Sequence, residues 1–150
     1  MTKETFLKAL NFVLKWEGGY VNNPNDLGGA TNKGITQNTY NTWLKATNQP
    51  LKNVKNITDR EVQEIYYKNY WLKAGCDKMT EKFAILCFDT AVNMGVGRVS
   101  EFLKYAEYKS PDKFIIARIR KYCEFAKVGN QKIFLQGWLN RILDLEKFIQ

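Results

Sequence analysis

The sequence predicts a mainly α-helical protein with a small β-hairpin or loop element after its first helix. Apolar residues recur at three- and four-residue spacing along most of the chain. Helix-capping residues precede several of these stretches. Residues 20–35, in contrast, hold the densest cluster of Gly, Asn, Pro and Asp. The 150 residues, 45% of them hydrophobic, are enough for one domain with a buried core. Since no repeat or linker interrupts them, we expect residues 1–150 to form a single domain.

The first helix is expected over about residues 2–16. Phe6, Leu10 and Val13 recur at helical spacing and define its core-facing stripe. The two glycines at 18–19 favour a left-handed helix stop. Residues 20–35 then predict a loop or short irregular hairpin, because Gly, Asn, Asp and Pro each favour turns.

The later helices are expected to begin at N-capping residues. Thr58 and Glu61 have the spacing of a capping box, and Ser110 is followed by a proline at the first helical position. The most apolar predicted helix ends at Gly95. We expect helices after Thr36, Thr58, Thr80 and Ser110, and a last helix over residues 131–148.

Composition limits the possible chemistry. The chain contains no histidine and no C-x-x-C pair, so we expect no metal site and no cofactor. Acid–base chemistry must then come from carboxylates, lysine or tyrosine, because Ser–His and Cys–His pairs are excluded. Cys76, Cys87 and Cys123 are unequally spaced, and we expect free thiols, with Cys87 and Cys123 buried among apolar neighbours.

The net charge of +8 is spread along the chain. It favours polyanionic partners: nucleic acid, an anionic membrane or an acidic cell wall. We do not expect nucleic-acid binding, because no predicted helix is crowded with Arg, Lys or Asn. No apolar run reaches the roughly 18 residues of a membrane span, so no stable membrane insertion is expected. The N-terminus lacks the pattern of a signal peptide, which predicts synthesis in the cytoplasm.

Glu17 is the first candidate catalytic residue. It continues the stripe of the first helix, so its side chain is predicted to face the core. Burial, apolar cover from Trp16 and Tyr20, and the partial negative charge of the helix C-terminus would all raise the pKa of Glu17. A carboxylic acid that keeps its proton near neutral pH can act as a general acid. The alternative is a solvated side chain at a helix end.

Asp26 and Thr31 follow Glu17 in the glycine-containing loop. Glycines allow such a loop to fold back toward the helix end. A carboxylic acid with a second carboxylate opposite it is the arrangement that glycoside hydrolysis uses. The loop therefore predicts a glycosidase site.

The segment EGGYVNNPNDLGGATNKGIT, residues 17–36, resembles the signature of glycoside hydrolase family 108, a lysozyme-like family of N-acetylmuramidases. Shorter segments agree with it: IYYKNYW at 65–71, FDTAVNMGVGR at 88–98 and GWLNR at 137–141. The resemblance implies a lysozyme-like helical fold. It also implies a Glu–Asp–Thr catalytic set at Glu17, Asp26 and Thr31.

The resemblance further implies cleavage of the β-1,4 bond between N-acetylmuramic acid and N-acetylglucosamine in peptidoglycan. Glu17 would be the general acid, Asp26 would orient or deprotonate water, and Thr31 would hold that water. Members of the family are phage endolysins or bacterial wall-remodelling enzymes. We therefore expect a monomer that acts on peptidoglycan strands, in the periplasm or outside, after holin-type or other export. Residues of about 87–150 resemble a shortened peptidoglycan-binding region, with a lysine- and tyrosine-rich segment at 98–130.

Tyr20, Asn32 and Lys33 flank the predicted site and are candidates for substrate binding. Asn32 and Lys33 could contact the N-acetyl or lactyl groups of the substrate. A solvated turn is the alternative for both.

Four residues farther along are also substrate-binding candidates. Tyr70 and Trp71 could stack on sugar rings, or else belong to the core. Asp89 and Asn93 lie four residues apart on one face of the most apolar helix and could line a cleft. Alternatively, Asp89 pairs with an arginine and Asn93 satisfies backbone groups near the helix end.

Two other functions remain compatible with these residues. A lytic transglycosylase would use the same acid without water and leave 1,6-anhydromuramic ends, which Asp26 disfavours. A peptidoglycan-binding protein would need no catalytic carboxylates. Asp26 and Thr31 together suit a held water, which favours an inverting mechanism.

Overall fold

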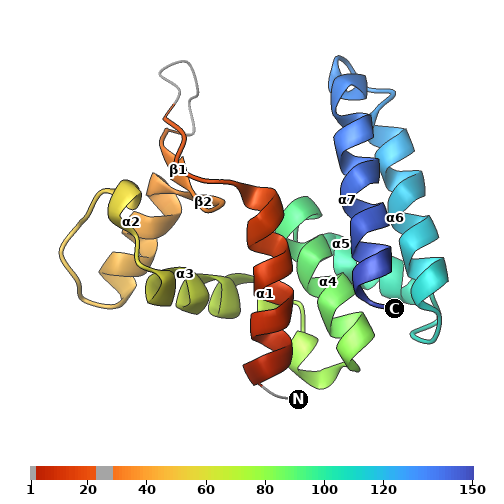
Figure 1. The fold of residues 1–150 in the computed structure, drawn as a ribbon, viewed down its shortest axis with the longest axis horizontal. Helices are drawn as coiled ribbons and strands as arrows, with labels where there is room; N and C mark the ends of the chain where they lie inside the picture. The colour runs from red at the N-terminus through yellow and green to blue at the C-terminus, as the bar shows by residue number, and fades with distance from the viewer. Residues whose placement is uncertain (1–2, 23–28) are drawn as a thin grey trace. The chain divides into compact units, whose positions relative to one another are not determined.

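The computed structural model describes residues 3–22 and 29–150 (Figure 1). It is mainly helical, as the sequence predicts, with a two-stranded antiparallel sheet after the first helix. Elements labelled η are single 3₁₀ turns, except η2, which is π-helical. In chain order the elements are α1 (Lys3–Glu17), β1 (Thr31–Asn32), β2 (Ile35–Thr36), α2 (Gln37–Ala46), η1 (Val54–Asn56), α3 (Asp59–Tyr66), η2 (Tyr67–Trp71), η3 (Cys76–Lys78), α4 (Glu81–Met94), α5 (Val96–Tyr105), α6 (Pro111–Phe125), η4 (Gln131–Phe134) and α7 (Leu135–Phe148).

The chain divides into two compact units, one of residues 10–69 and one of residues 1–9 with 70–150. The single domain expected from the sequence stays a prediction. Among the described helices, none combines the length and the apolar character needed to cross a bilayer.

The unit of residues 10–69 contains the hairpin and the helices around it. Leu10 and Val13 of α1 are buried, as their spacing predicts. Thr36 ends β2 and caps α2, its hydroxyl accepting the backbone N–H of Thr39. At the start of α3 the capping box is present, since the Thr58 and Glu61 side chains each accept the other's backbone N–H.

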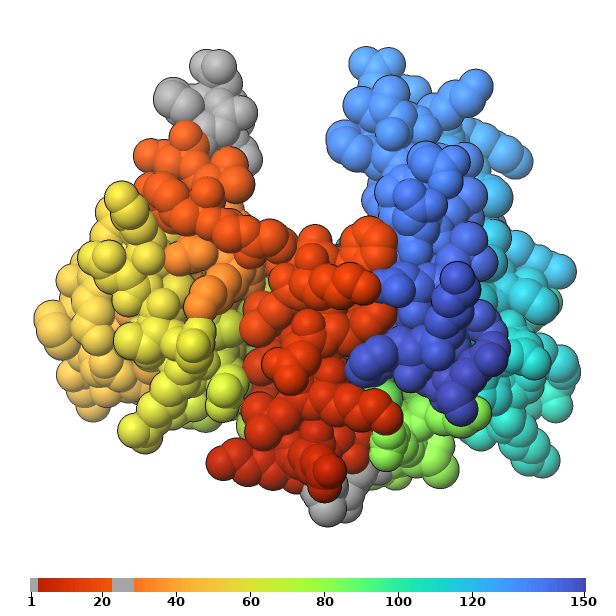
Figure 2. Space-filling view, viewed as in Figure 1, coloured from red at the N-terminus to blue at the C-terminus, as the bar shows by residue number. Residues whose placement is uncertain are grey.

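The other unit is built around α4. Its residues from Phe83 to Ala91 are all buried, and α4 contacts α5 and α6. Helices α6 and α7 lie side by side (Figure 1), and their blue surfaces touch along most of their length (Figure 2). Helix α4 is apolar around its whole circumference, and a helix of this kind is stable only when neighbours cover every face.

Two sequence expectations are corrected in this unit. Helix α5 was not predicted, and it begins at Val96 directly after Gly95, whose φ of 90° ends α4. Cys123 is exposed rather than buried, whereas Cys87 is buried as expected. Cys123 lies on α6, a helix that is buried on one face only, and Cys123 is not among its buried residues. All three cysteines are free thiols.

Candidate active site

Glu17 is the last residue of α1. It is half-buried, although the preceding stripe residues Leu10 and Val13 are almost inaccessible to solvent. The expectation of a fully buried carboxylate is therefore wrong in degree. The physical reason is that α1 ends at this point, where Gly18 takes a φ of 72°.

The side chain of Glu17 packs against the turn of the hairpin at Gly34. A Cβ atom built on Gly34 would lie 3.0 Å from Oε2 and 3.1 Å from Cβ of Glu17. Gly34 also has a φ of 74°, a conformation in which a Cβ costs roughly 1–2 kcal/mol. Glycine at this position thus permits both the tight turn and the close approach of Glu17.

Tyr66, the last residue of α3, approaches the same glycine. Its hydroxyl would lie 2.4 Å from the Cβ built on Gly34, and it donates a 2.8 Å hydrogen bond to the backbone carbonyl of Lys33. The ring is buried. The Tyr66 hydroxyl and the Glu17 carboxylate therefore lie within 3.0 Å of one point. Tyr66 was not among the predicted site residues, although it lies in the IYYKNYW segment.

Backbone pairing fixes Thr31 in the hairpin. Thr31 pairs with Thr36 across the two strands. On its other side it exchanges two 2.8 Å hydrogen bonds with Val21. Thr31 is half-buried, so its position is set by backbone on both sides.

Asp26 lies outside the described residues, so the structure gives no distance between its carboxyl group and that of Glu17. Its predicted role therefore stays a prediction, and so does the inverting outcome that would follow from that distance.

Asn32 is a structural residue of the hairpin. Its buried amide donates two 3.1 Å hydrogen bonds, to the backbone carbonyls of Val54 and Lys55. This corrects both readings of Asn32, as a sugar contact through its amide and as a solvated turn residue. The physical reason is that η1 packs on β1 and leaves two carbonyls that need donors.

Lys33 and Tyr20 present side chains near the hairpin surface. Lys33 has a φ of 49° and forms an ion pair with Asp59, and this ammonium group lowers the pKa of Asp59. Tyr20 is 38% exposed, with the Lys55 ammonium 5.7 Å from its ring centroid. Both side chains are accessible, as substrate-binding residues must be.

Asp89 and Asn93 belong to one polar network with Arg118, Arg141 and Tyr122, and Asp89 is its buried centre. Asp89 Oδ1 accepts hydrogen bonds of 2.7 and 3.0 Å from Arg141, and its Oδ2 lies 2.7 Å from Arg118. Asn93 Oδ1 accepts a 2.5 Å hydrogen bond from Tyr122. Asp89 is fully buried. The substrate-binding role predicted for Asp89 is therefore wrong, and the arginine pairing given as its alternative is confirmed. The role of Asn93, which is half-buried, stays a prediction.

Trp71 is a core residue. It is 2% exposed, and its ring contacts Phe6 and Phe88 edge to face at centroid distances of 5.4 Å. A ring enclosed by two others has no face left for a sugar, so the stacking role predicted for Trp71 is wrong. Tyr70 is half-buried, and its role stays a prediction.

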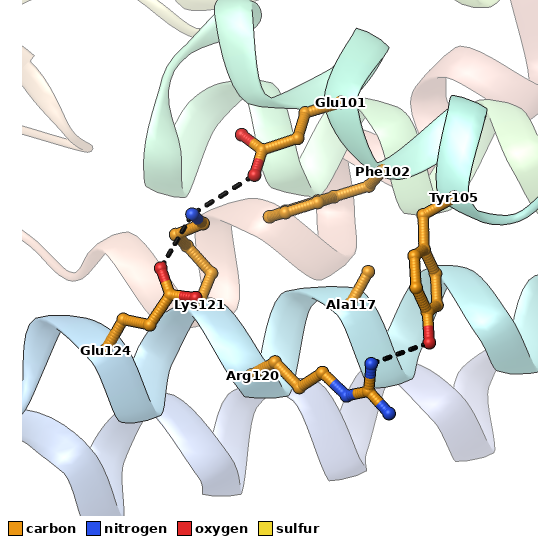
Figure 3. A pocket seen from close by; sticks show the side chains of 7 residues that line it. All are labelled: Glu101, Phe102, Tyr105, Ala117, Arg120, Lys121 and Glu124. Atoms are coloured by element: carbon orange, nitrogen blue, oxygen red, sulfur yellow. Dashed lines mark hydrogen bonds and ion pairs between the residues drawn. The ribbon is translucent and has the colours of Figure 1, made fainter.

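A separate hollow of about 360 Å³ lies between α5 and α6. Lys121 there pairs with Glu101 at 3.1 Å and with Glu124 at 2.7 Å, while Arg120 donates to the hydroxyl of Tyr105 at 2.8 Å (Figure 3). The Lys121 ammonium is thus held by two carboxylates, and none of the site residues predicted from the sequence lines this hollow.

The described residues contain no cluster of three or more Cys, Asp or Glu side chains that could hold a metal ion.

Comparisons with known proteins place this geometry in a family. The chain is similar over its whole length to a solved structure, SagA of Brucella abortus, with 27% identity and a TM-score of 0.77 over 99% of this chain and 95% of SagA. A comparison with curated proteins finds no match. The family model described as glycosyl hydrolase 108 matches residues 10–95, which include Glu17, the hairpin and Tyr66. Since this match covers more than half of the chain, the protein belongs to the glycosyl hydrolase 108 family, whose members are glycosidases.

Proposed function

We propose that the protein is an N-acetylmuramidase that hydrolyses the β-1,4 bond between N-acetylmuramic acid and N-acetylglucosamine in peptidoglycan. The observation that carries the proposal is the carboxylate of Glu17, held against the hairpin turn at Gly34 inside the segment that matches a glycosidase family. The net charge of +8 supports approach to an anionic cell wall.

In the proposed reaction Glu17 is the general acid. Its proton passes to the glycosidic oxygen as the C–O bond breaks, and a water molecule attacks the anomeric carbon. Thr31, fixed by Val21 and Thr36, is placed in the same hairpin as Gly34 and would hold that water. Asp26 would accept the water's proton, as the family resemblance implies. Asp26 would then release this proton to solvent and Glu17 would take one up from solvent, so that both carboxyl groups return to their starting states.

The half-buried position of Glu17 suits this role. A general acid has to reach the glycosidic oxygen, so its carboxyl group needs an accessible side. The opposite side packs against Gly34, which restricts the side chain. This orientation lowers the entropic part of the barrier.

The site of action and the role of the C-terminal segment belong to the same proposal. The enzyme would act as a monomer on the wall, in the periplasm or outside, after holin-type or other export. Residues of about 87–150 would add contacts to peptidoglycan, as their resemblance to a shortened peptidoglycan-binding region suggests.

Glu17→Gln tests the proposal on purified peptidoglycan. We expect this variant to lose about 100- to 10,000-fold of the clearing rate, because removal of a general acid costs this much. It should still sediment with the insoluble wall. The matched control is Glu4→Gln, an exposed change of the same charge at the other end of α1, which should clear at the wild-type rate.

Mass spectrometry of the released fragments tests the reaction type. Hydrolysis predicts reducing N-acetylmuramic acid ends, whereas 1,6-anhydromuramic ends would identify a lytic transglycosylase and overturn the hydrolytic step. Normal clearing by Glu17→Gln would remove Glu17 from the mechanism.

A further inference from the structure

The connection between α6 and α7 exposes a concentrated set of apolar side chains. In this segment, residues 126–134, which we call the α6–α7 tip, Val128 is 66% exposed, Ile133 74% and Phe134 49%. The tip forms the end of the paired helices α6 and α7 (Figure 1), and it protrudes beyond their packed surfaces (Figure 2). Single exposed apolar residues are ordinary, but three within seven residues are a typical mark of a binding surface.

The tip is an ordered turn, so these side chains are held outward by the fold. The N–H of Val128 donates to the carbonyl of Phe125 at 3.0 Å, and that of Gln131 donates to the carbonyl of Val128 at 3.2 Å. At its base the ring of Phe134 lies 6.0 Å from that of Trp138. Exposure of Val128 and Ile133 therefore does not come from an unfolded helix end.

The charge around these apolar residues has one sign. Between Glu124 and Asp144 the sequence has three basic residues and no acidic one. Arg141 is buried on Asp89, which leaves Lys127 and Lys132, both exposed. The tip thus presents apolar side chains flanked by two lysines.

We infer that the α6–α7 tip docks reversibly on an anionic lipid surface. Apolar side chains enter the boundary between headgroups and acyl chains, while lysines next to them contact lipid phosphates. A soluble or wall-bound polyanion would need the lysines alone and would leave Val128 and Ile133 in water. The contact is interfacial and requires no spanning helix. It is also independent of the proposed hydrolysis, because Glu17 takes no part in it.

The test is co-sedimentation of the full chain with vesicles of phosphatidylglycerol and phosphatidylcholine, and with vesicles of phosphatidylcholine alone, at about 0.1 M salt, where the Debye length is about 10 Å. We expect binding to the anionic vesicles. Val128→Ser with Ile133→Ser should lower the partition coefficient about tenfold or more, because the apolar contribution is lost. Lys127→Gln with Lys132→Gln should lower it by a similar factor.

Matched controls separate the tip from general surface properties. Leu51→Ser with Leu72→Ser removes two apolar residues that are 61% and 43% exposed. Lys104→Gln with Lys109→Gln removes the same charge from another exposed segment. Both control pairs should bind vesicles within about twofold of wild type, since neither changes the tip.

Three results would overturn the inference. The first is equal vesicle binding by the tip variants and their controls. The second is that the protein binds heparin as well as vesicles, and that Val128→Ser with Ile133→Ser changes neither binding. This would identify a general polyanion site. The third is that the wild-type protein does not bind vesicles but self-associates in sedimentation velocity, and that the same variant abolishes this self-association. The occupant of the tip would then be a second copy of the chain.

Discussion

Gly34→Ala is expected to damage the proposed site because the new Cβ would come too close to Tyr66 and Glu17. The new Cβ would meet the Tyr66 hydroxyl at 2.4 Å and Oε2 of Glu17 at 3.0 Å. To restore a contact of at least 3.0 Å, the hydroxyl has to move away, which breaks or lengthens its hydrogen bond to the carbonyl of Lys33. The left-handed backbone at Gly34 adds strain for any residue with a Cβ.

The expected loss of stability follows from these two contributions. A Cβ in a left-handed conformation costs roughly 1–2 kcal/mol, and loss of the Tyr66 hydrogen bond costs about 0.5–1.5 kcal/mol. A total of about 2–3 kcal/mol should lower Tm by roughly 5–10 °C for a chain of this size. Glu17 has to give way by a few tenths of an ångström. This should also lower the clearing rate, although by less than the roughly 100-fold that a 1 Å misplacement can cost. Thermal unfolding and the turbidity of a peptidoglycan suspension measure the two effects.

Two variants make the comparison specific. Gly29→Ala has the same backbone strain, with a φ of 72°, but no atom of the described residues lies within 4 Å of the new Cβ. It should lose only the 1–2 kcal/mol of strain. Tyr66→Phe combined with Gly34→Ala removes the 2.4 Å contact and should recover part of the stability, but not the activity, because the contacts with Glu17 remain. If Gly34→Ala and Gly29→Ala have equal stability and equal activity, the close approach of Glu17 has no role in the site.

Two further predictions concern buried carboxylates. Asp89→Asn should destabilise the fold by about 3–5 kcal/mol in urea unfolding, because two buried guanidinium groups lose their partner, whereas the exposed control Asp112→Asn should cost less than about 1 kcal/mol. Although burial raises the pKa of Glu61, hydrogen bonds from Thr58 and Lys52 outweigh it and lower this pKa to about 2. Since the folded pKa is below the unfolded one, the resulting stabilisation of about 3 kcal/mol is present above pH 4.5 and is lost as the pH falls toward 2. Unfolding midpoints over that range should fall less steeply in Glu61→Gln, and an unchanged slope would contradict the assignment.

Local periodicity predicted the direction of Glu17 but not its degree of burial. The spacing from Phe6 to Val13 correctly placed the buried stripe of α1, because helical geometry is set by neighbouring residues. Glu17 packs against Gly34, and the Tyr66 hydroxyl approaches the same glycine. These contacts depend on how the hairpin and α3 fold back, which no local pattern encodes.

Contacts between residues far apart in the sequence also explain the wrong predictions for Asp89 and Trp71. Asp89 pairs with Arg141, which lies 52 residues farther along the chain. Trp71, in the middle of the sequence, contacts Phe6 near its start. A carboxylate or an indole on an apolar face is compatible with a cleft or with a core until its partner is known.

Helix α5 was missed for a local reason. Glycines at 95 and 97 predict a stop followed by a loop. Gly95 does end α4, with a φ of 90°, but no loop follows it, because α5 starts at the next residue, Val96. The buried residues Val99, Phe102 and Leu103 have the helical spacing that identifies α5.

The groups that should stabilise the fold most and the proposed catalytic acid lie in different compact units. The Asp89 network is buried in the unit of residues 1–9 and 70–150, while Glu17, Gly34 and Tyr66 all belong to the unit of residues 10–69. Asp89→Asn should therefore lower the free energy of unfolding more than Gly34→Ala does, and yet clear peptidoglycan at nearly the wild-type rate well below its unfolding midpoint. Gly34→Ala should lose less unfolding free energy than Asp89→Asn but more of the clearing rate. If instead activity followed stability in both variants, the approach of Glu17 to Gly34 would be an ordinary packing contact, and the placement of the acid would have to depend on other residues.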